Sequence, residues 1–187
     1  RDAEVVLAVR DAVGPDAKIM VDANFGYDGH LDLLEEFVRE TLSANVLWFE
    51  EMVTAALRAY RAFRDILSRA GSDAWLVCGE VDREPVSEVF RDLITEGLID
   101  GYQPDIVAHI NGGPITMPLE EIETIVRETD CYLEIATSGN QRRAIELMES
   151  VHRERAVGRL MLGTDTPGGT GIVPRAMLWN VALLASQ

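Results

Sequence analysis

Short apolar segments rich in β-branched and aromatic residues alternate with helical patterns along the whole chain. Six segments have the character of strands, at residues 17–24, 45–51, 74–80, 99–110, 131–140 and 159–165. Helical patterns with apolar residues three and four apart fill the intervals and both ends, at 1–13, 31–43, 54–70, 86–96, 119–128, 141–155 and 174–186. This alternation is typical of parallel strands joined by right-handed crossovers, so it predicts an α/β fold.

Acidic residues stand at the ends of several predicted strands. Asp22, Glu50, Glu80 and Asp165 each end or closely follow an apolar run and precede turn residues. Functional groups at the carboxyl ends of successive parallel strands are typical of (βα) barrels. An open doubly wound sheet would more often carry a glycine-rich phosphate loop after its first strand, and the sequence has none. We therefore predict one TIM-barrel-like domain over residues 1–187. Because six strands are visible and a closed barrel needs eight, the barrel is expected to be incomplete or recombined.

Composition excludes several classes of partner. The 187 residues are 47% hydrophobic and 26% charged, as in ordinary globular proteins. Acids outnumber Lys and Arg by 32 to 17, for a net charge of −15, which argues against nucleic acid and anionic membranes. No apolar run approaches the roughly 20 residues of a spanning helix, and no secretory pattern opens the chain. We expect a cytoplasmic protein whose two cysteines, Cys78 and Cys131, are reduced.

The spacing of three strand-end acids points to a metal. Asp22 and Glu50 are 28 residues apart, and Glu50 and Glu80 are 30 apart, which is one βα unit for each step. Three oxygen ligands with open positions suit Mg²⁺, or else Mn²⁺, which holds a substrate carboxylate and stabilises an enediolate. The alternative is that each acid merely ends its strand and is hydrated.

Four stretches of the first half carry a family resemblance: "VRDAVGPDAKIMVDANFGYD", "LWFEEM", "VCGE" and "LIDGYQPDI". Together they resemble the barrel domain of the enolase superfamily, in the mandelate racemase and muconate lactonizing branch, over residues 1 to about 105. The resemblance implies that Asp22, Glu50 and Glu80 bind magnesium and that Asp105 is the acid on the next strand. Members of that branch also use a lysine base on an earlier strand. Here the single lysine, Lys18, precedes its strand, so we expect impaired turnover or none.

The second half resembles another family. "HINGGP" and "GTDTPGGTG", within residues 104 to 187, resemble the amidohydrolase superfamily, closest to enamidase-like members. That resemblance implies metal binding, in this reading Zn²⁺, by His109 and Asp165. The chain has only three histidines and no His-x-His pair, so a complete site of that kind is not expected. His109 is alternatively a buried strand residue, and Asp165 alternatively caps the following turn. A junction between 1–105 and 106–187 is the corresponding expectation for chain organisation.

Three functional hypotheses follow. The first is a Mg²⁺-dependent lyase or isomerase acting on a small carboxylate substrate, with Asp105 or His109 as the acid–base residue. The second is a metal-dependent hydrolase of cyclic amides centred on His109 and Asp165. The third is a recombined or truncated barrel without catalytic function. In each case the first and last strands should expose their edges or pair with a second copy in a homodimer.

Overall fold

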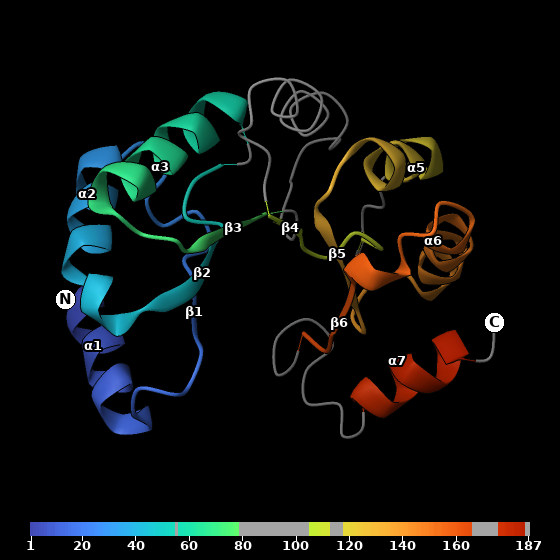
Figure 1. Ribbon diagram of the computed structural model, residues 1–187, viewed down its shortest axis with the longest axis horizontal. Helices are drawn as coiled ribbons and strands as arrows, with labels where there is room; N and C mark the ends of the chain where they lie inside the picture. The colour runs from blue at the N-terminus through green and yellow to red at the C-terminus, as the bar shows by residue number, and fades with distance from the viewer. Residues whose placement is uncertain (55, 79–104, 113–117, 166–175, 186–187) are drawn as a thin grey trace.

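Six parallel strands form one curled sheet in the computed structural model, which describes residues 1–54, 56–78, 105–112, 118–165 and 176–185 (Figure 1). The strands are β1 (Ile19–Asp22), β2 (Val46–Glu50), β3 (Trp75–Cys78), β4 (Ile106–Val107), β5 (Tyr132–Ala136) and β6 (Leu160–Gly163). Each strand pairs in parallel with the next, so that the spatial order is the chain order. The predicted α/β fold with about six parallel strands is confirmed.

The helices lie around the outer side of this sheet (Figure 1). They are α1 (Asp2–Val13), α2 (Leu31–Glu40), α3 (Leu57–Ala70), α5 (Leu119–Glu128), α6 (Gln141–Arg153) and α7 (Ala176–Ala185). Short 3₁₀ helices, η1 (Leu42–Ala44) and η2 (Val157–Arg159), precede β2 and β6. The helix expected at 86–96 lies outside the described residues. None of the described helices combines the length and apolar character needed to cross a membrane.

The main core lies between the helices and the outer face of the sheet. The amphipathic helix α2 buries Leu34, Phe37 and Val38 against the sheet and α3. The ring of Phe37 meets Phe49 of β2 at a centroid distance of 6.1 Å, and Phe49 meets Phe63 of α3 at 5.9 Å. Burial of these apolar side chains is the main force that holds the helices on the sheet.

A second, smaller apolar cluster covers the inner face of the sheet. Its members are Trp48, Trp75, Val77, Ile106, Ala108 and Met161. Successive side chains of a strand point to opposite faces, so residues two positions from a member of this cluster share its face. This alternation determines which strand-end side chains point to the inner face.

The curl of the sheet leaves it open. Figure 1 shows an arc in which β1 and β6 are the two end strands, and among the described strands each of them pairs on one side only. A barrel of this kind closes with eight strands. The prediction of an incomplete barrel is therefore confirmed.

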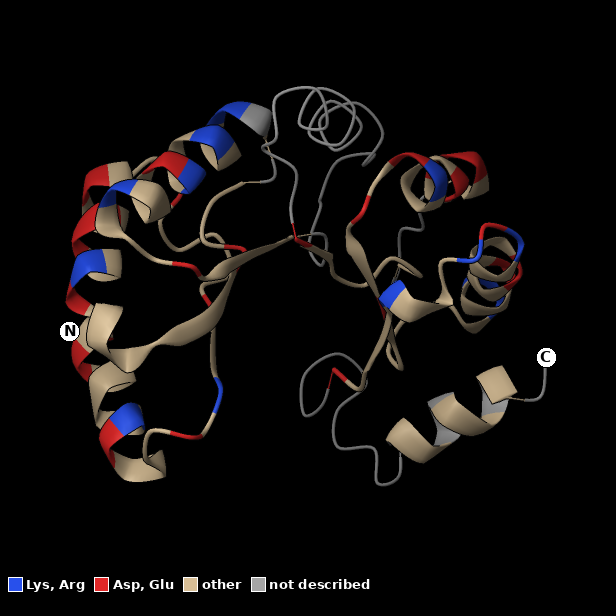
Figure 2. Cartoon of the chain, in the orientation of Figure 1, with Lys and Arg blue, Asp and Glu red and all other residues tan. Residues whose placement is uncertain are grey.

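Charged and apolar surfaces are separated on the helices. Figure 2 shows Lys, Arg, Asp and Glu mainly on the helices from α1 to α6, while the sequence of α7 contains none. Along the chain, the valine-rich α1 precedes β1 and α7 follows β6, and these two strands are the end strands of the sheet. The ends of the arc therefore carry the more apolar helices.

Candidate active site

Asp22 and Glu50 end neighbouring strands and lie side by side. They are direct partners in the parallel ladder between β1 and β2, and the amide of Ala23 donates to the carbonyl of Glu50 at 3.1 Å. Glu50 is two residues after Trp48 of the inner cluster, and Asp22 is two residues after the exposed Met20. Adjacent strands are about 5 Å apart, so two carboxylates share one small area of the inner face at the carboxyl ends.

The loop after β1 keeps Asp22 in place. The Asp22 Oδ1 accepts a hydrogen bond from the amide of Asn24 at 2.9 Å. Further along, the amide of Tyr27 donates to the carbonyl of Met52 at 3.1 Å, and the amide of Thr54 donates to Asp28 Oδ1 at 3.2 Å. The chain after β1 is thus tied to the chain after β2, which fixes the two strand ends relative to each other.

The second acid of the "FEE" run has a different environment. Glu51 is 2% exposed and follows β2 with a left-handed backbone, and its amide donates to the carbonyl of Val77 at 3.2 Å. The neighbouring hydroxyl of Tyr60 donates to the same carbonyl at 3.0 Å. Burial raises the pKa of Tyr60 well above its usual value, and Cys78 and Glu51 add to the effect. The inner-face acid of the pair is Glu50, because it lies two residues after Trp48 of the inner cluster.

The third expected ligand, Glu80, lies outside the described residues. Within the part of the chain that the structure describes, no three His, Cys, Asp or Glu side chains are grouped closely enough to hold a metal ion. This holds for the surroundings of His109 and Asp165 as well as for those of Asp22 and Glu50.

Backbone strain is concentrated at the carboxyl ends of the strands. Asn24, Phe25, Glu51, His109 and Asp165 have φ angles between 44° and 62°, and each lies within three residues of the end of a strand. Non-glycine residues rarely adopt this conformation, and such outliers occur preferentially at functional sites. The strand ends after β1, β2, β4 and β6 are therefore the strongest candidates for an active-site rim, and they include His109 and Asp165.

Asp105 lies away from this rim. It immediately precedes β4, and its Oδ2 accepts hydrogen bonds from the amide of Leu76 at 2.7 Å and from Arg64 of α3 at 2.9 Å. Ile106 belongs to the inner cluster and Val107 to the outer core, so alternation turns Asp105 toward the helices. The structure thus separates Asp105 from Asp22 and Glu50 and pairs it with an arginine.

Glu134 of β5 is an inner-face acid that the sequence analysis did not select. Its Oε2 accepts a hydrogen bond from the amide of His109 at 3.4 Å. The neighbours Leu133 and Ile135 belong to the outer core, so Glu134 points to the inner face. The available signal in the sequence was a single acid with an apolar residue on either side of it in "YLEIA".

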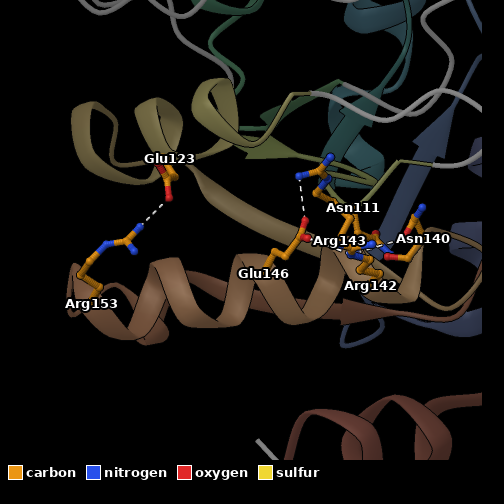
Figure 3. A network of polar contacts seen from close by, with 7 residues as sticks. All are labelled: Asn111, Glu123, Asn140, Arg142, Arg143, Glu146 and Arg153. Atoms are coloured by element: carbon orange, nitrogen blue, oxygen red, sulfur yellow. Dashed lines mark hydrogen bonds and ion pairs between the residues drawn. The ribbon is translucent and has the colours of Figure 1, made fainter.

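A buried amide connects the loops that follow β4 and β5 (Figure 3). Asn111 is fully buried, and its side chain donates to the carbonyl of Ala136 and accepts from the amide of Ala136, both at 3.0 Å. The amide of Asn140 donates to the carbonyl of Asn111 at 3.2 Å, and Asn140 Oδ1 caps α6 by accepting from the amide of Arg143 at 3.0 Å. The loop that begins at His109 is therefore fixed to the end of β5.

These features define a class of protein: an incomplete (βα) barrel with carboxylates and strained backbone at the carboxyl rim, which is where barrel enzymes carry their active sites. Comparison with known proteins gives the family. The family described as "Enolase C-terminal domain-like" matches residues 1–114, and the chain belongs to it.

Two curated relatives match parts of the chain. An enamidase of Eubacterium barkeri is 38% identical over 85 residues, which are 46% of this chain and 22% of the enamidase. A D-galactarolactone cycloisomerase of Agrobacterium fabrum (strain C58 / ATCC 33970) is 37% identical over 79 residues, which are 40% of this chain and 20% of that enzyme. The matched segment is about a fifth of the length of each relative.

Solved structures show the same architecture. The crystal structure of enamidase, described as a member of the amidohydrolase superfamily, aligns with a TM-score of 0.66 at 28% identity, over 82% of this chain and 39% of the enamidase chain. A mutant galacturonate dehydratase from Geobacillus sp. complexed with Mg aligns with a TM-score of 0.57 at 17% identity, over 87% of this chain and 40% of that one. The latter likeness concerns the fold alone.

The expected division of the chain near residue 105 is not supported. The enolase-type family match continues to residue 114 and so includes "HINGGP", which we had assigned to the second family. Likeness to the enamidase structure extends over 82% of the chain and is therefore not confined to residues 106–187.

Proposed function

We propose that this domain serves a Mg²⁺-dependent lyase or isomerase of the enolase type that acts on a small carboxylate substrate. Asp22 and Glu50 would be metal ligands, with Glu80 as the third. The observation that carries the proposal is the direct pairing of Asp22 with Glu50 at the carboxyl ends of adjacent strands, on the inner face. Membership of the enolase-type family, sequence likeness to the D-galactarolactone cycloisomerase and fold likeness to the galacturonate dehydratase agree with it.

The donor set suits magnesium. Mg²⁺ prefers hard oxygen ligands and is commonly bound by one or two protein carboxylates together with water and substrate oxygens. Two carboxylates held side by side repel each other unless a cation lies between them. Mn²⁺ takes the same kind of ligands and is the natural substitute, whereas Zn²⁺ favours nitrogen and sulfur. When bound, the ion would supply charge stabilisation for an enediolate formed from the substrate carboxylate.

The proton-transfer machinery is the incomplete part of this proposal. The single lysine, Lys18, immediately precedes β1 and so lies at the amino end of the sheet, opposite Asp22. His109 and Asp165 follow the carboxyl ends of β4 and β6 and remain candidates for proton transfer at the rim. Because the branch normally uses a lysine base, we propose that this chain turns over slowly or not at all without a substitute group.

Calorimetric titration with Mg²⁺ tests the metal site. Wild type should bind Mg²⁺ or Mn²⁺ below millimolar concentration and melt at a higher temperature as the metal concentration rises. Glu50→Gln keeps the size of the side chain but removes its charge, so it should abolish both effects. Glu149→Gln, at an exposed position of α6, is the matched control and should behave like wild type. Absence of binding and of the melting shift in wild type would leave a barrel without a metal-dependent function.

The enamidase likeness favours a second candidate, a metal-dependent hydrolase of cyclic amides centred on His109 and Asp165. Such a site would prefer Zn²⁺, because imidazole suits this ion. Zn²⁺ binding that is lost in His109→Ala but kept in Glu50→Gln would favour this candidate over the enolase-type site.

A further inference from the structure

Glu134 is a carboxylate of the inner face on the half of the sheet remote from Asp22 and Glu50. It pairs with Met161 of β6, which belongs to the inner cluster, while Leu133 and Ile135 on either side of it pack in the outer core. Three strand steps separate β2 from β5, and the sheet curls between them (Figure 1). The curl turns the inner face of β5 toward that of β1 and β2.

The Glu134 carboxylate is positioned by backbone groups of the neighbouring strand ends. Its Oε2 accepts the hydrogen bond from the amide of His109, at 3.4 Å. Gly163, at the end of β6, leaves the space that Oε1 occupies, because a Cβ at this position would overlap the carboxylate. Glu134 is therefore held between the ends of β4 and β6, at the level of the rim.

Asp105 and Lys18 are less well placed for a reaction at the rim. Asp105 points toward the helices and pairs with Arg64, and Lys18 lies at the amino end of β1. We propose that Glu134 is the acid–base residue that faces the metal-binding carboxylates, in place of Asp105. This proposal rests on the enolase-type function proposed above.

The chemistry needs only a carboxylate and a proton. The Glu134 carboxylate removes the hydrogen on the carbon next to the substrate carboxylate: the C–H bond breaks, an O–H bond forms on Glu134, and the electron pair spreads onto the substrate carboxylate. Return of a proton to the same carbon restores the substrate, with solvent exchange as the visible result. General acid–base groups of this kind contribute about 10²–10⁴-fold to a rate.

Exchange of that hydrogen in D₂O tests the role. The probes are mandelate, D-galacturonate and D-galactonate, each with a hydrogen on the carbon next to the carboxylate, and the loss of its proton NMR signal is followed with Mg²⁺ present. Wild type should exchange at least one probe, and Glu134→Gln should be slower by about 100-fold or more. Glu149→Gln is the matched control. Calorimetric binding of Mg²⁺ and of the exchanging probe is measured on every variant, together with its melting temperature.

The readouts separate the two proposals. Loss of exchange in Glu134→Gln with retained binding of Mg²⁺ and probe supports an acid–base role, since a merely structural role would disturb binding or melting. Exchange that persists in Glu134→Gln, or a wild type that binds Mg²⁺ but exchanges no probe, overturns the role of Glu134 and leaves the metal site intact. A wild type that binds no Mg²⁺ overturns both. If Glu134→Gln does not fold, Glu134→Asp, which shortens the side chain and keeps its charge, gives the same comparison.

Discussion

Gly163 makes room for Glu134: a β-carbon on residue 163 would overlap the Oε1 atom of the Glu134 carboxylate. Gly163→Ala must therefore displace the carboxylate or shift the end of β6. We expect the free energy of unfolding to fall by about 1–3 kcal/mol, as for other overpacking substitutions. The rate of exchange of the substrate hydrogen should also fall, because the Glu134 carboxylate would be displaced from its position beside residue 163.

Gly158 provides the matched control for this prediction. A β-carbon at Gly158 meets no heavy atom within 4 Å, so Gly158→Ala should change the free energy of unfolding by no more than about 0.5 kcal/mol. Urea unfolding of the two variants compares them directly. Equal stability of both variants would show that the Glu134 carboxylate can move aside at little cost and that Gly163 is not needed to make room for it.

Glu35 joins two helices through two arginines and predicts a pH dependence. Hydrogen bonds from Arg69 of α3 and from Arg39 lower the pKa of Glu35 to about 2. A carboxyl whose pKa is depressed in the folded state adds stability above its unfolded pKa of about 4.3, and this stability is lost as the pH falls toward the folded value. The melting temperature of wild type should therefore exceed that of Glu35→Gln at pH 6, and the difference should vanish between about pH 4.3 and pH 2.

The position of Glu35 on the surface limits the size of this effect. Exposed ion pairs contribute little and are screened by salt, so the difference should also shrink at 1 M NaCl. Glu149→Gln, measured over the same pH range, should show no comparable difference. A gap between wild type and Glu35→Gln that is constant from pH 6 to pH 2 would contradict the prediction.

Much of the fold could be predicted from the sequence because each βα unit has a local signature. The expected helix at 119–128 coincides with α5, and the strand expected at 45–51 contains β2. The helix expected at 31–43 ends at Glu40, since the Thr41 hydroxyl bonds back to the carbonyl of Phe37 and the chain tightens into η1. Hydrophobic periodicity does not resolve such local endings.

The site was less predictable because it depends on the face to which each strand residue points. The placement of Asp22 and Glu50 at strand ends could be predicted, because each of them closes an apolar run. Asp105 could not be placed, because apolar residues on both faces of the following strand, Ile106 to Ala108, leave the alternation undefined in the sequence. Glu134 was not selected, because its position is defined by contacts with His109 and Gly163, which belong to the ends of two other strands.

Replacement of Asn111 by alanine should lower the free energy of unfolding markedly. Its buried side chain satisfies both the amide and the carbonyl of Ala136. Asn111→Ala removes one partner from each of these backbone groups, while the Ala136 carbonyl keeps the hydrogen bond from the amide of Gly139 at 3.1 Å. The free energy of unfolding should therefore fall by about 1–3 kcal/mol. Ser43→Ala, at an exposed position, is the control for polar-to-alanine substitution. Chemical denaturation measures both, and a loss in Asn111→Ala no larger than in the control would contradict the role of this side chain.

Self-association is the prediction that follows from the open sheet. Three valines spaced four residues apart on α1, Val5, Val9 and Val13, are 60%, 42% and 49% exposed. On α7, Leu178 is 64% and Val181 is 48% exposed. With two free sheet edges between these helices among the described strands, we expect the 187-residue chain to form a dimer or larger species in light scattering.

The net negative charge of the chain opposes this association, so the association should depend on salt concentration. A net charge of −15 makes two copies repel each other, so salt should strengthen the association by screening, as expected for an apolar contact. Val9→Glu places a charge in the middle of the valine stripe and should shift the population toward monomer. Ser68→Glu adds the same charge at an exposed position of α3 and should have a much smaller effect. A chain that stays monomeric in high salt, or dimers unaffected by Val9→Glu, would show that the valine stripe of α1 makes no such contact.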